Sequence, residues 1–406
     1  MASSPLTPST SRIEVLDYVR GLAIIHIILY HYFMEWFHGS FLIVPEGVAA
    51  NMSRLEMFHD GGVLGFVKNM FGFLWVYGFF SVNLFLVLSG FVLTYSALKN
   101  EIRLIDDVRP VTFFDNMRVL FVFYWKKMKR VLIPLYISIL IGIGFLYLRN
   151  VLFPSLGGAP IYTGFDVLKL FFVPLLVFDI PFLQKFNGDL WFITLILQVY
   201  ILFPLLYRGL KSFGVWKFLA LLFAITVGFR YLITYQGLSS PMGVIADAPH
   251  SYRLFSFFLP RLVEFGFGMG LAYLFLTGKD VLVKMSGWRG FLGGVALALT
   301  GFVFDMYRWG WPYADLMAAV GLFVVFLNIG VLFAKVELMR RVMVFLSDSS
   351  YENFLLHHYF LNYFLMPLLL VGGLIRESVF WLMMPVFVVG SVGIGWAAQK
   401  IGAKLG

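Results

Sequence analysis

One face of the apolar segment 15–36 carries ionisable residues at a spacing that suits chemistry. Arg20 and His31 are eleven positions apart, so a helix, at about 100° per residue, directs them within about 20° of each other. Asp17 falls about one turn before Arg20, and Glu35 about one turn beyond His31. Ionisable groups inside a membrane are costly and usually serve binding or proton transfer. This face is the first candidate site; the alternative is a structural Asp17–Arg20 pair and a histidine hydrogen bonded to a neighbouring helix.

A second group lies in the segment 349–364, SSYENFLLHHYFLNYF. Tyr351 and His358 are seven positions apart and share a helix face, as do Ser350 and His357. Hydroxyl and imidazole groups on one face can line a polar cavity between helices, so this segment is the second candidate.

A third group is the pair Arg261 and Glu264, three positions apart in an apolar segment and able to pair along a helix. A structural ion pair and a role in substrate binding are equally consistent with that spacing. Arg230 and Arg253 fall near the outer ends of their segments, where we expect them to extend toward the membrane surface.

Other chemistries find no support in the sequence. The chain contains no phosphate-binding GxxxxGK[ST] loop, dinucleotide GxGxxG unit, HExxH zinc helix or GxSxG elbow. It has no cysteine, which excludes disulfides, thiolate metal ligands and cysteine nucleophiles. We therefore expect no metal.

The elements that must position these residues are membrane helices. Of 406 residues, 60% are hydrophobic and 13% are charged, whereas soluble domains carry about 25% charge. A crossing helix needs about 20 mostly apolar residues. Ten stretches qualify, at 15–36, 74–97, 131–149, 189–207, 214–234, 253–277, 287–306, 312–334, 350–371 and 378–400.

An eleventh stretch, 167–182, is shorter and is interrupted by Pro174 and Pro181. Because proline breaks the backbone ladder, we expect a re-entrant or interfacial half-span there. The predicted fold is therefore an all-α polytopic membrane protein with about ten transmembrane helices and one such half-span.

Loop charges set the predicted orientation. With ten crossings, one side collects twenty Lys and Arg residues and the other seven, so both termini are expected to be cytoplasmic. This asymmetry accounts for most of the net charge of +9, and we expect no nucleic-acid partner.

Residues 1–13 form a polar tail expected to be disordered, and 14–406 form one transmembrane domain. The aromatic and basic second half of the segment 98–130 is typical of a helix in the membrane interface. Its cations would serve either as a lipid anchor or as a floor for a phosphorylated ligand.

Several stretches in order resemble the acyltransferase 3 family of membrane-bound acyltransferases. LDYVRGLAIIHIILYH is similar to the family's opening motif, with Arg20 and His31 at its Arg and His. SVNLFLVLSGF, FVFYWKKMKRVLIPLY, LWFITLILQVYILFP and PRLVEFGFGMG are similar to the family's later segments, and SSYENFLLHH resembles its S-Y-x-x-Y-L-x-H element. Two positions depart from the family pattern: Asn83 replaces a common Asp, and residues 195–198 lack a carboxylate that many members have.

The resemblance implies a transmembrane acyltransferase that uses cytosolic acyl-CoA, most often acetyl-CoA. The acceptor would be a hydroxyl or amine, for instance on a cell-surface glycan or lipid-linked sugar. In that role His31 is the catalytic base or an acyl carrier, and Arg20, held by Asp17, contacts the donor. The basic residues expected at the donor are Lys126, Lys127 and Arg130. The residues expected to line the substrate cavity are Ser89, Trp191, Arg261, Glu264, Tyr351 and His357.

The rival interpretation is a proton-coupled transporter that uses the same buried His, Arg and Glu residues. Against it, the chain shows no inverted repeat with matched broken helices. In either case we expect a multi-pass protein of the cell membrane in contact with lipid, and the sequence leaves a homo-oligomer open.

Overall fold

The computed structural model describes residues 13–37, 43, 45–55, 58, 61–99, 113–157, 166–170, 186–236 and 257–405. The predicted tail before Ile13, Arg253 and most of the predicted half-span 167–182 lie outside these described residues.

Most of the described residues are helical and none of them forms a strand, which confirms the predicted all-α class. The elements before residue 160 are α1 (Glu14–Trp36), α2 (Val48–Leu55), α3 (Gly62–Val76), η1 (Tyr77–Phe80), α4 (Ser81–Lys99), α5 (Phe113–Leu152) and η2 (Pro154–Leu156). Those from residue 186 to 305 are η3 (Gly188–Leu190), α8 (Trp191–Gln236), η5 (Leu259–Arg261), α10 (Leu262–Leu276), α11 (Val281–Met285) and α12 (Trp288–Asp305). The remaining elements are α13 (Trp311–Phe333), α14 (Glu337–Asp348), α15 (Ser350–Phe360), the π-helical turn η6 (Leu361–Leu365), α16 (Met366–Val371) and α17 (Glu377–Leu405).

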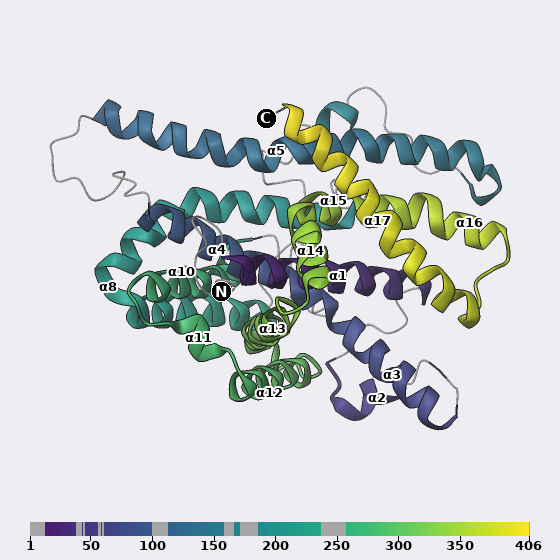
Figure 1. The fold of residues 1–406 in the computed structure, drawn as a ribbon, viewed down its shortest axis with the longest axis horizontal. Helices are drawn as coiled ribbons and strands as arrows, with labels where there is room; N and C mark the ends of the chain where they lie inside the picture. The colour runs from purple at the N-terminus through teal and green to yellow at the C-terminus, as the bar shows by residue number, and fades with distance from the viewer. Residues whose placement is uncertain are drawn as a thin grey trace.

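Helix α1 lies in the middle of the bundle (Figure 1). It packs against α4, α13, α14, α15 and α17, and most of its residues from Val15 to Trp36 are buried. Glu14 and Asp17 stand in its first turn, where negative charge favours the helix dipole. A helix surrounded in this way can bring its polar side chains into contact with several neighbours.

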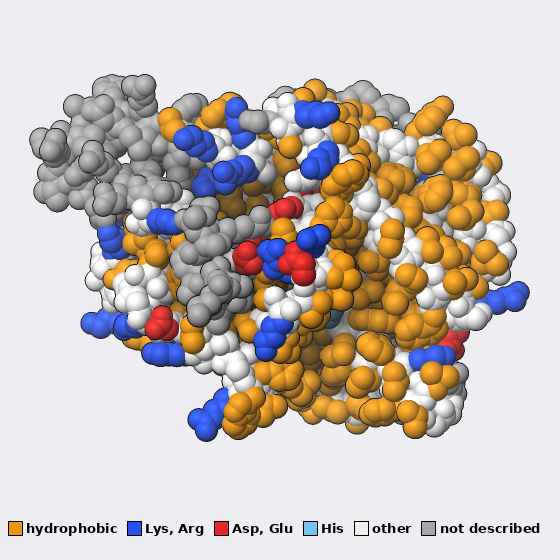
Figure 2. All heavy atoms as spheres, viewed as in Figure 1, with side chains coloured by type: hydrophobic (Ala, Val, Ile, Leu, Met, Phe, Trp, Pro, Cys, Tyr) orange, Lys and Arg blue, Asp and Glu red, His pale blue; other side chains and the backbone are white. Residues whose placement is uncertain are grey.

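The surface has the apolar character of a membrane protein. Figure 2 shows Lys and Arg side chains gathered on the left and centre of the face, while the right half is largely apolar. The outer helices α5 and α17 expose large apolar side chains, among them Leu140 at 60% and Val389 at 71%. Exposed apolar area of this extent needs lipid to cover it.

Seven helices in the described ranges are long and apolar enough to cross a membrane. The chain is therefore membrane-embedded, but the count of ten crossings is not confirmed and stays a prediction. Helices α1 and α12, of 23 and 18 residues, are outside the seven; charged residues such as Arg20 and Arg289 lower their apolar character. The 46-residue helix α8 is two helices joined at a kink, where Gly214 has φ 71°.

The expected interfacial helix near 113–130 is not separate from the crossing helix 131–149. Both lie on α5, a single helix of 40 residues that continues through Pro134. A proline leaves one carbonyl without its backbone partner, and the helix nevertheless persists on both sides.

Helices α4 and α10 pack so closely that only glycine fits at their contact. A Cβ atom at Gly90 would meet the carbonyl oxygen of Phe265, and one at Gly268 would meet that of Val87. Small residues allow membrane helices to approach at backbone distance. This explains Gly90 of the LSGF stretch and Gly268 of the GFGMG stretch, and it fixes α4 beside α10.

We expect single cysteines at Lys279 and Lys335 to resist an impermeant maleimide added to intact cells, and cysteines at Arg308 and Arg376 to react with it. All four side chains are exposed, and the chain has no native cysteine. The expectation follows from the excess of basic residues on the cytoplasmic side of membrane proteins. Labelling at Lys279 or Lys335 from outside would contradict the predicted orientation; permeabilised cells provide the control that each cysteine is reactive.

Candidate active site

Three histidines and one carboxylate meet between α1, η3 and α15. His31 Nδ1 lies 2.7 Å from His357 Nε2, and His31 Nε2 lies 3.5 Å from Asp189 Oδ1. The other oxygen, Asp189 Oδ2, is 3.4 Å from His357 Nε2 and 3.6 Å from His358 Nδ1. We call these four residues the histidine cluster.

Local structure fixes the orientation of the cluster. The Asn187 side chain accepts a hydrogen bond from the backbone N–H of Asp189 at 2.9 Å and donates one to the carbonyl of Leu355 at 2.9 Å. An asparagine that bonds the backbone two residues on is a common turn device, and here it also ties η3 to α15. The side chain of Asp189 is consequently held beside His357.

The hydrogen bonds assign the histidine tautomers. His357 Nδ1 lies 2.9 Å from the carbonyl oxygen of Asn353, so that nitrogen carries the proton and donates. His357 Nε2 then has a lone pair, and His31 Nδ1 must donate to it across 2.7 Å. This leaves His31 Nε2 unprotonated and facing Asp189, and an unprotonated imidazole nitrogen is the group required of a general base.

The π-helical turn η6 follows the cluster immediately along the chain. Such turns are uncommon and are often found at functional sites. In it Asn362 donates a hydrogen bond of 3.4 Å to Glu35, the fourth residue of the predicted α1 face. Glu35 also lies within electrostatic range of Asp189, so this end of the face is connected to the cluster.

A second group of polar residues, the Arg–Tyr cluster, gathers near the other end of the α1 face. It consists of Arg20, Ser89, Arg130, Tyr200 and Tyr351. Tyr200 is hydrogen bonded to Ser89 and lies within electrostatic range of both arginines. Tyr351 is within range of Tyr200 and donates a hydrogen bond of 3.0 Å to the carbonyl of Val131. Four of the residues expected at the site from the sequence are therefore brought together here.

Arg20 is also held by Asp17, as expected. Their closest side-chain atoms are 3.8 Å apart, and Asp17 accepts a hydrogen bond of 3.1 Å from Ser347 on α14. The Arg20 side chain keeps 30% of its surface exposed. Lys126 and Lys127 lie one turn before Arg130 on α5, with Lys126 exposed and Lys127 half-buried.

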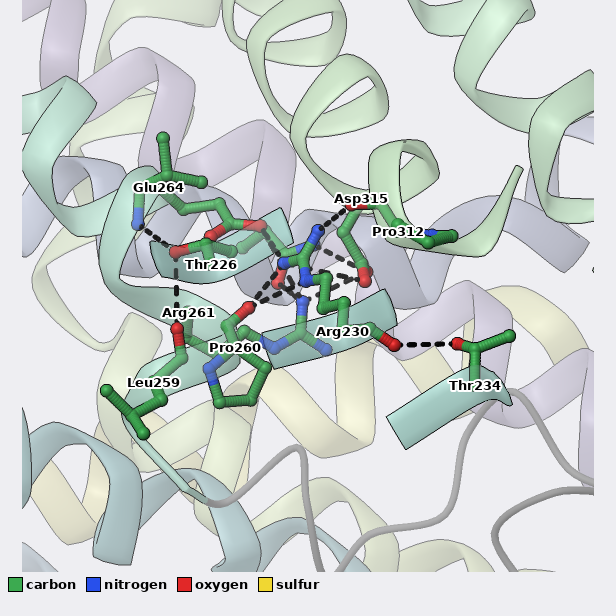
Figure 3. A network of polar contacts seen from close by, with 11 residues as sticks. Thr226, Arg230, Thr234, Leu259, Pro260, Arg261, Glu264, Pro312 and Asp315 are labelled. Carbon is green, nitrogen blue, oxygen red and sulfur yellow. Dashed lines mark hydrogen bonds and ion pairs between the residues drawn. The ribbon is translucent and has the colours of Figure 1, made fainter. Parts of the chain in front are cut away.

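Arg261 and Glu264 belong to a different group, a buried ion network shown in Figure 3. The predicted contact between them is present at 4.0 Å, but each has a closer partner. Arg261 pairs with Asp315 at 2.9 Å, and Glu264 pairs with Arg230 at 2.5 Å. Two arginines and two carboxylates thus balance one another inside the bundle.

The prediction that Arg230 extends toward the membrane surface is wrong. Its side chain is 6% exposed and donates to the carbonyl oxygens of Pro260 at 2.8 Å and Pro312 at 3.2 Å. Proline gives its carbonyl but no N–H to a helix, and these carbonyls, together with Glu264, provide the partners that a buried guanidinium needs.

Asn83, where the family often has Asp, joins the same network. It accepts a hydrogen bond from Arg261 at 2.8 Å and donates one to Asp315 at 3.2 Å. An amide can bond a cation and a carboxylate at once. The neutral side chain therefore leaves the network with two positive and two negative groups.

We expect Glu264→Gln to reduce the stability of the protein more than its catalytic rate, because it leaves Arg230 without its closest anionic partner. Removing one partner of a buried pair costs about 3–5 kcal/mol. Thermal unfolding in detergent measures the effect. Glu377→Gln is the matched control, since it removes the partner of Lys68 from a pair in which Glu377 is 42% exposed. A stable Glu264→Gln protein without transferase activity would instead place Glu264 in the catalytic site.

Sequence reasoning missed Asp189 and Asp315, and it named His358 on the face shared with Tyr351 without including it among the expected site residues. Asp189 is the first residue of the predicted stretch 189–207, two positions before Trp191, where a carboxylate is easily taken for an ordinary helix-end residue. Trp191 itself is half-buried as the first residue of α8. The sequence signal that could have identified Asp189 was its position as an acidic residue at the edge of an apolar stretch.

Comparison with known proteins identifies the family. The family model of the acyltransferase domain, acyltransferase 3, matches residues 13–400, nearly the whole chain. No curated protein and no solved structure matches the chain significantly.

Proposed function

Since the chain belongs to the acyltransferase 3 family of membrane acyltransferases, we propose that it moves an acyl group from cytosolic acyl-CoA, with acetyl-CoA as the first choice. The acceptor is a hydroxyl or amine, most simply on a cell-surface glycan or lipid-linked sugar. The observation that carries the proposal is the His31–His357 hydrogen bond of 2.7 Å beside the Asp189 carboxylate. Family membership favours this enzyme over the proton-coupled transporter.

The Arg–Tyr cluster is the proposed donor end. Arg20 and Arg130 offer planar groups that bind phosphate or carbonyl oxygen in pairs of hydrogen bonds, and Lys126 and Lys127 add charge that attracts a polyanion. Arg20 and His31 are separated by about 16 Å along α1, at 1.5 Å per residue. The long pantetheine arm of CoA separates its phosphates from its thioester, which suits a site with cations at one end and a base at the other.

The histidine cluster is the proposed place of transfer. His31 Nε2 takes the proton of the acceptor hydroxyl, whose oxygen forms a bond to the thioester carbonyl carbon. The carbon–sulfur bond breaks, and the CoA thiolate leaves and takes from His31 the proton that the acceptor had lost, which returns His31 to its neutral form. Asp189, 3.5 Å from His31 Nε2, stabilises the imidazolium that forms, as fixed charges do at developing charge in a transition state. His357 holds the ring of His31 through the hydrogen bond to Nδ1.

Ser89, Tyr351 and Trp191 are proposed to line the path between these two ends. We propose that Arg261 and Glu264 support the bundle through the ion network and do not contact substrate. The proposed location is the cell membrane, with both termini in the cytoplasm, so that the Arg–Tyr cluster meets the cytosolic donor.

We expect Arg20→Ala to weaken acetyl-CoA binding, and Arg20→Lys to restore it only in part, because an ammonium lacks the planar fork of the guanidinium. A charge-assisted hydrogen bond contributes about 1.5–3 kcal/mol, which corresponds to roughly 10- to 150-fold in affinity. Calorimetric titration of purified protein in nanodiscs with acetyl-CoA measures it. Lys279→Ala, which removes an exposed cation outside the Arg–Tyr cluster, is the control. Equal affinity in wild type and Arg20→Ala would remove Arg20 from the donor site.

A further inference from the structure

We propose that the histidine cluster is a binding site for a divalent transition-metal cation of the zinc type. One nitrogen from each of His31, His357 and His358 and one oxygen of Asp189 lie within 4.8 Å of one another. A tetrahedral zinc site with bonds of about 2.0–2.1 Å places its ligand atoms about 3.3–3.4 Å apart. The contacts of Asp189 with the three histidines, at 3.4, 3.5 and 3.6 Å, are close to that spacing.

The groups in the cluster are prepared to accept a cation. His357 donates its Nδ1 proton to the carbonyl of Asn353, and metal-bound histidines characteristically donate their second ring N–H to such an oxygen. Asp189 is 4% exposed, and its buried Oδ2 atom has no hydrogen-bond partner. A buried carboxylate oxygen without a partner is costly, and a cation at the centre of the cluster provides one.

The donor set selects the class of cation. Imidazole nitrogens suit Zn²⁺, Cu²⁺, Ni²⁺ and Fe²⁺, whereas Mg²⁺ and Ca²⁺ prefer oxygen ligands. The cation can reach the cluster because the side chains of His31 and His358 are 15% and 14% exposed. Thiolates play no part, since the chain has no cysteine.

Four protein ligands imply a closed site. Catalytic zinc sites usually have three protein ligands and an open position for water, while four protein ligands fill a tetrahedron. The cation would bind the His31 nitrogen that faces Asp189. It would also bind His357 Nε2, which then gives up the hydrogen bond that it accepts from His31 Nδ1 in the metal-free cluster. This consequence rests on the proposed function: a bound cation then prevents His31 from taking a proton, and so inhibits acyl transfer until it is removed.

The test is a titration of tag-free, chelator-treated protein in nanodiscs with Co²⁺, followed by visible absorption, and with Zn²⁺, followed by calorimetry. We expect one equivalent to bind, with the intense visible bands of tetrahedral Co²⁺. Loss of a residue that only hydrogen bonds to a metal ligand typically weakens metal binding about 10- to 100-fold. His358→Ala and Asp189→Asn each remove a ligand, so each should weaken binding at least as much. His26→Gln is the control, because His26 lies on α1 with His31 but contacts Ser81 and the carbonyl of Leu74.

Binding of no cation by the wild type, or a weak six-coordinate Co²⁺ spectrum, would overturn the proposal, whether or not the variants fold. Wild-type affinity in His358→Ala and in Asp189→Asn would also overturn it, as would loss of binding in folded His26→Gln. Transfer assays on the same samples separate the two claims. If the cation binds stoichiometrically and transfer is unchanged, only the inhibitory role is overturned. If the metal-free protein shows no transfer at all, the proposed function is contradicted, and the Co²⁺ spectrum still tests the metal site.

Discussion

His31→Ala is expected to abolish acyl transfer while acyl-CoA binding stays close to wild type. In the proposed mechanism the unprotonated Nε2 of His31, which faces Asp189, is the general base, and loss of a general base typically costs a factor on the order of 10²–10⁴ in rate. Donor binding should survive because the proposed donor site is the Arg–Tyr cluster, whose Arg20 lies about 16 Å away along α1. The measurements are a steady-state transfer assay and calorimetric titration with acetyl-CoA on the same preparation.

The matched control is His26→Ala, because His26 is a histidine of the same helix directed to Ser81 and the carbonyl of Leu74. We expect it to retain transfer, corrected for any loss of folded protein. Parallel losses of donor binding and transfer in His31→Ala would contradict the separation of the two ends, and a wild-type rate would exclude His31 as the base.

Asp189→Asn is expected to lower the maximal rate by about 10²-fold or more, with little change in donor affinity. The amide keeps the shape of the side chain but removes the negative charge 3.5 Å from His31 Nε2. Loss of one preorganised electrostatic contact to a transition state typically costs about 10²–10³ in rate. Asp189→Glu should recover part of the rate, because it restores the charge at a displaced position.

Asp305→Asn serves as the control for Asp189→Asn. Asp305 is likewise a buried carboxylate, 4% exposed, but it ends α12 and lies outside the histidine cluster. If the two variants lose activity equally, the effect of Asp189→Asn comes from a general disturbance of buried charge, and Asp189 is not part of the reaction.

The sequence predicts what lies on one helix much better than which helices meet. The α1 face was predictable because a helix repeats at a fixed angle. The structure places Asp17 beside Arg20 and places both His31 and Glu35 at the histidine cluster. The all-helical class followed from the apolar stretches. The contact of His31 with His357 joins residues 326 positions apart, and helical periodicity carries no information about such neighbours.

Asp189 and Arg230 show where the remaining predictions failed. Asp189 is aimed by a short turn that Asn187 holds against α15, so its role depends on a tertiary contact. Arg230 is stabilised by the carbonyls of Pro260 and Pro312 and by Glu264, partners that come from separate elements. A buried charge can be recognised only when the groups that neutralise it are known.

The most direct test of acyl transfer at the histidine cluster is a single-turnover experiment on purified protein in liposomes. Labelled acetyl-CoA is mixed with an alkyl glucoside as acceptor, and both the released thiol and the acylated glucoside are counted with time. The chain has no cysteine, so a thiol reagent detects CoA alone. The predicted result is equal amounts of free CoA and acetylated glucoside for wild type, and neither for His31→Ala. Equal release of CoA by wild type and His31→Ala, or no release by wild type, would contradict it.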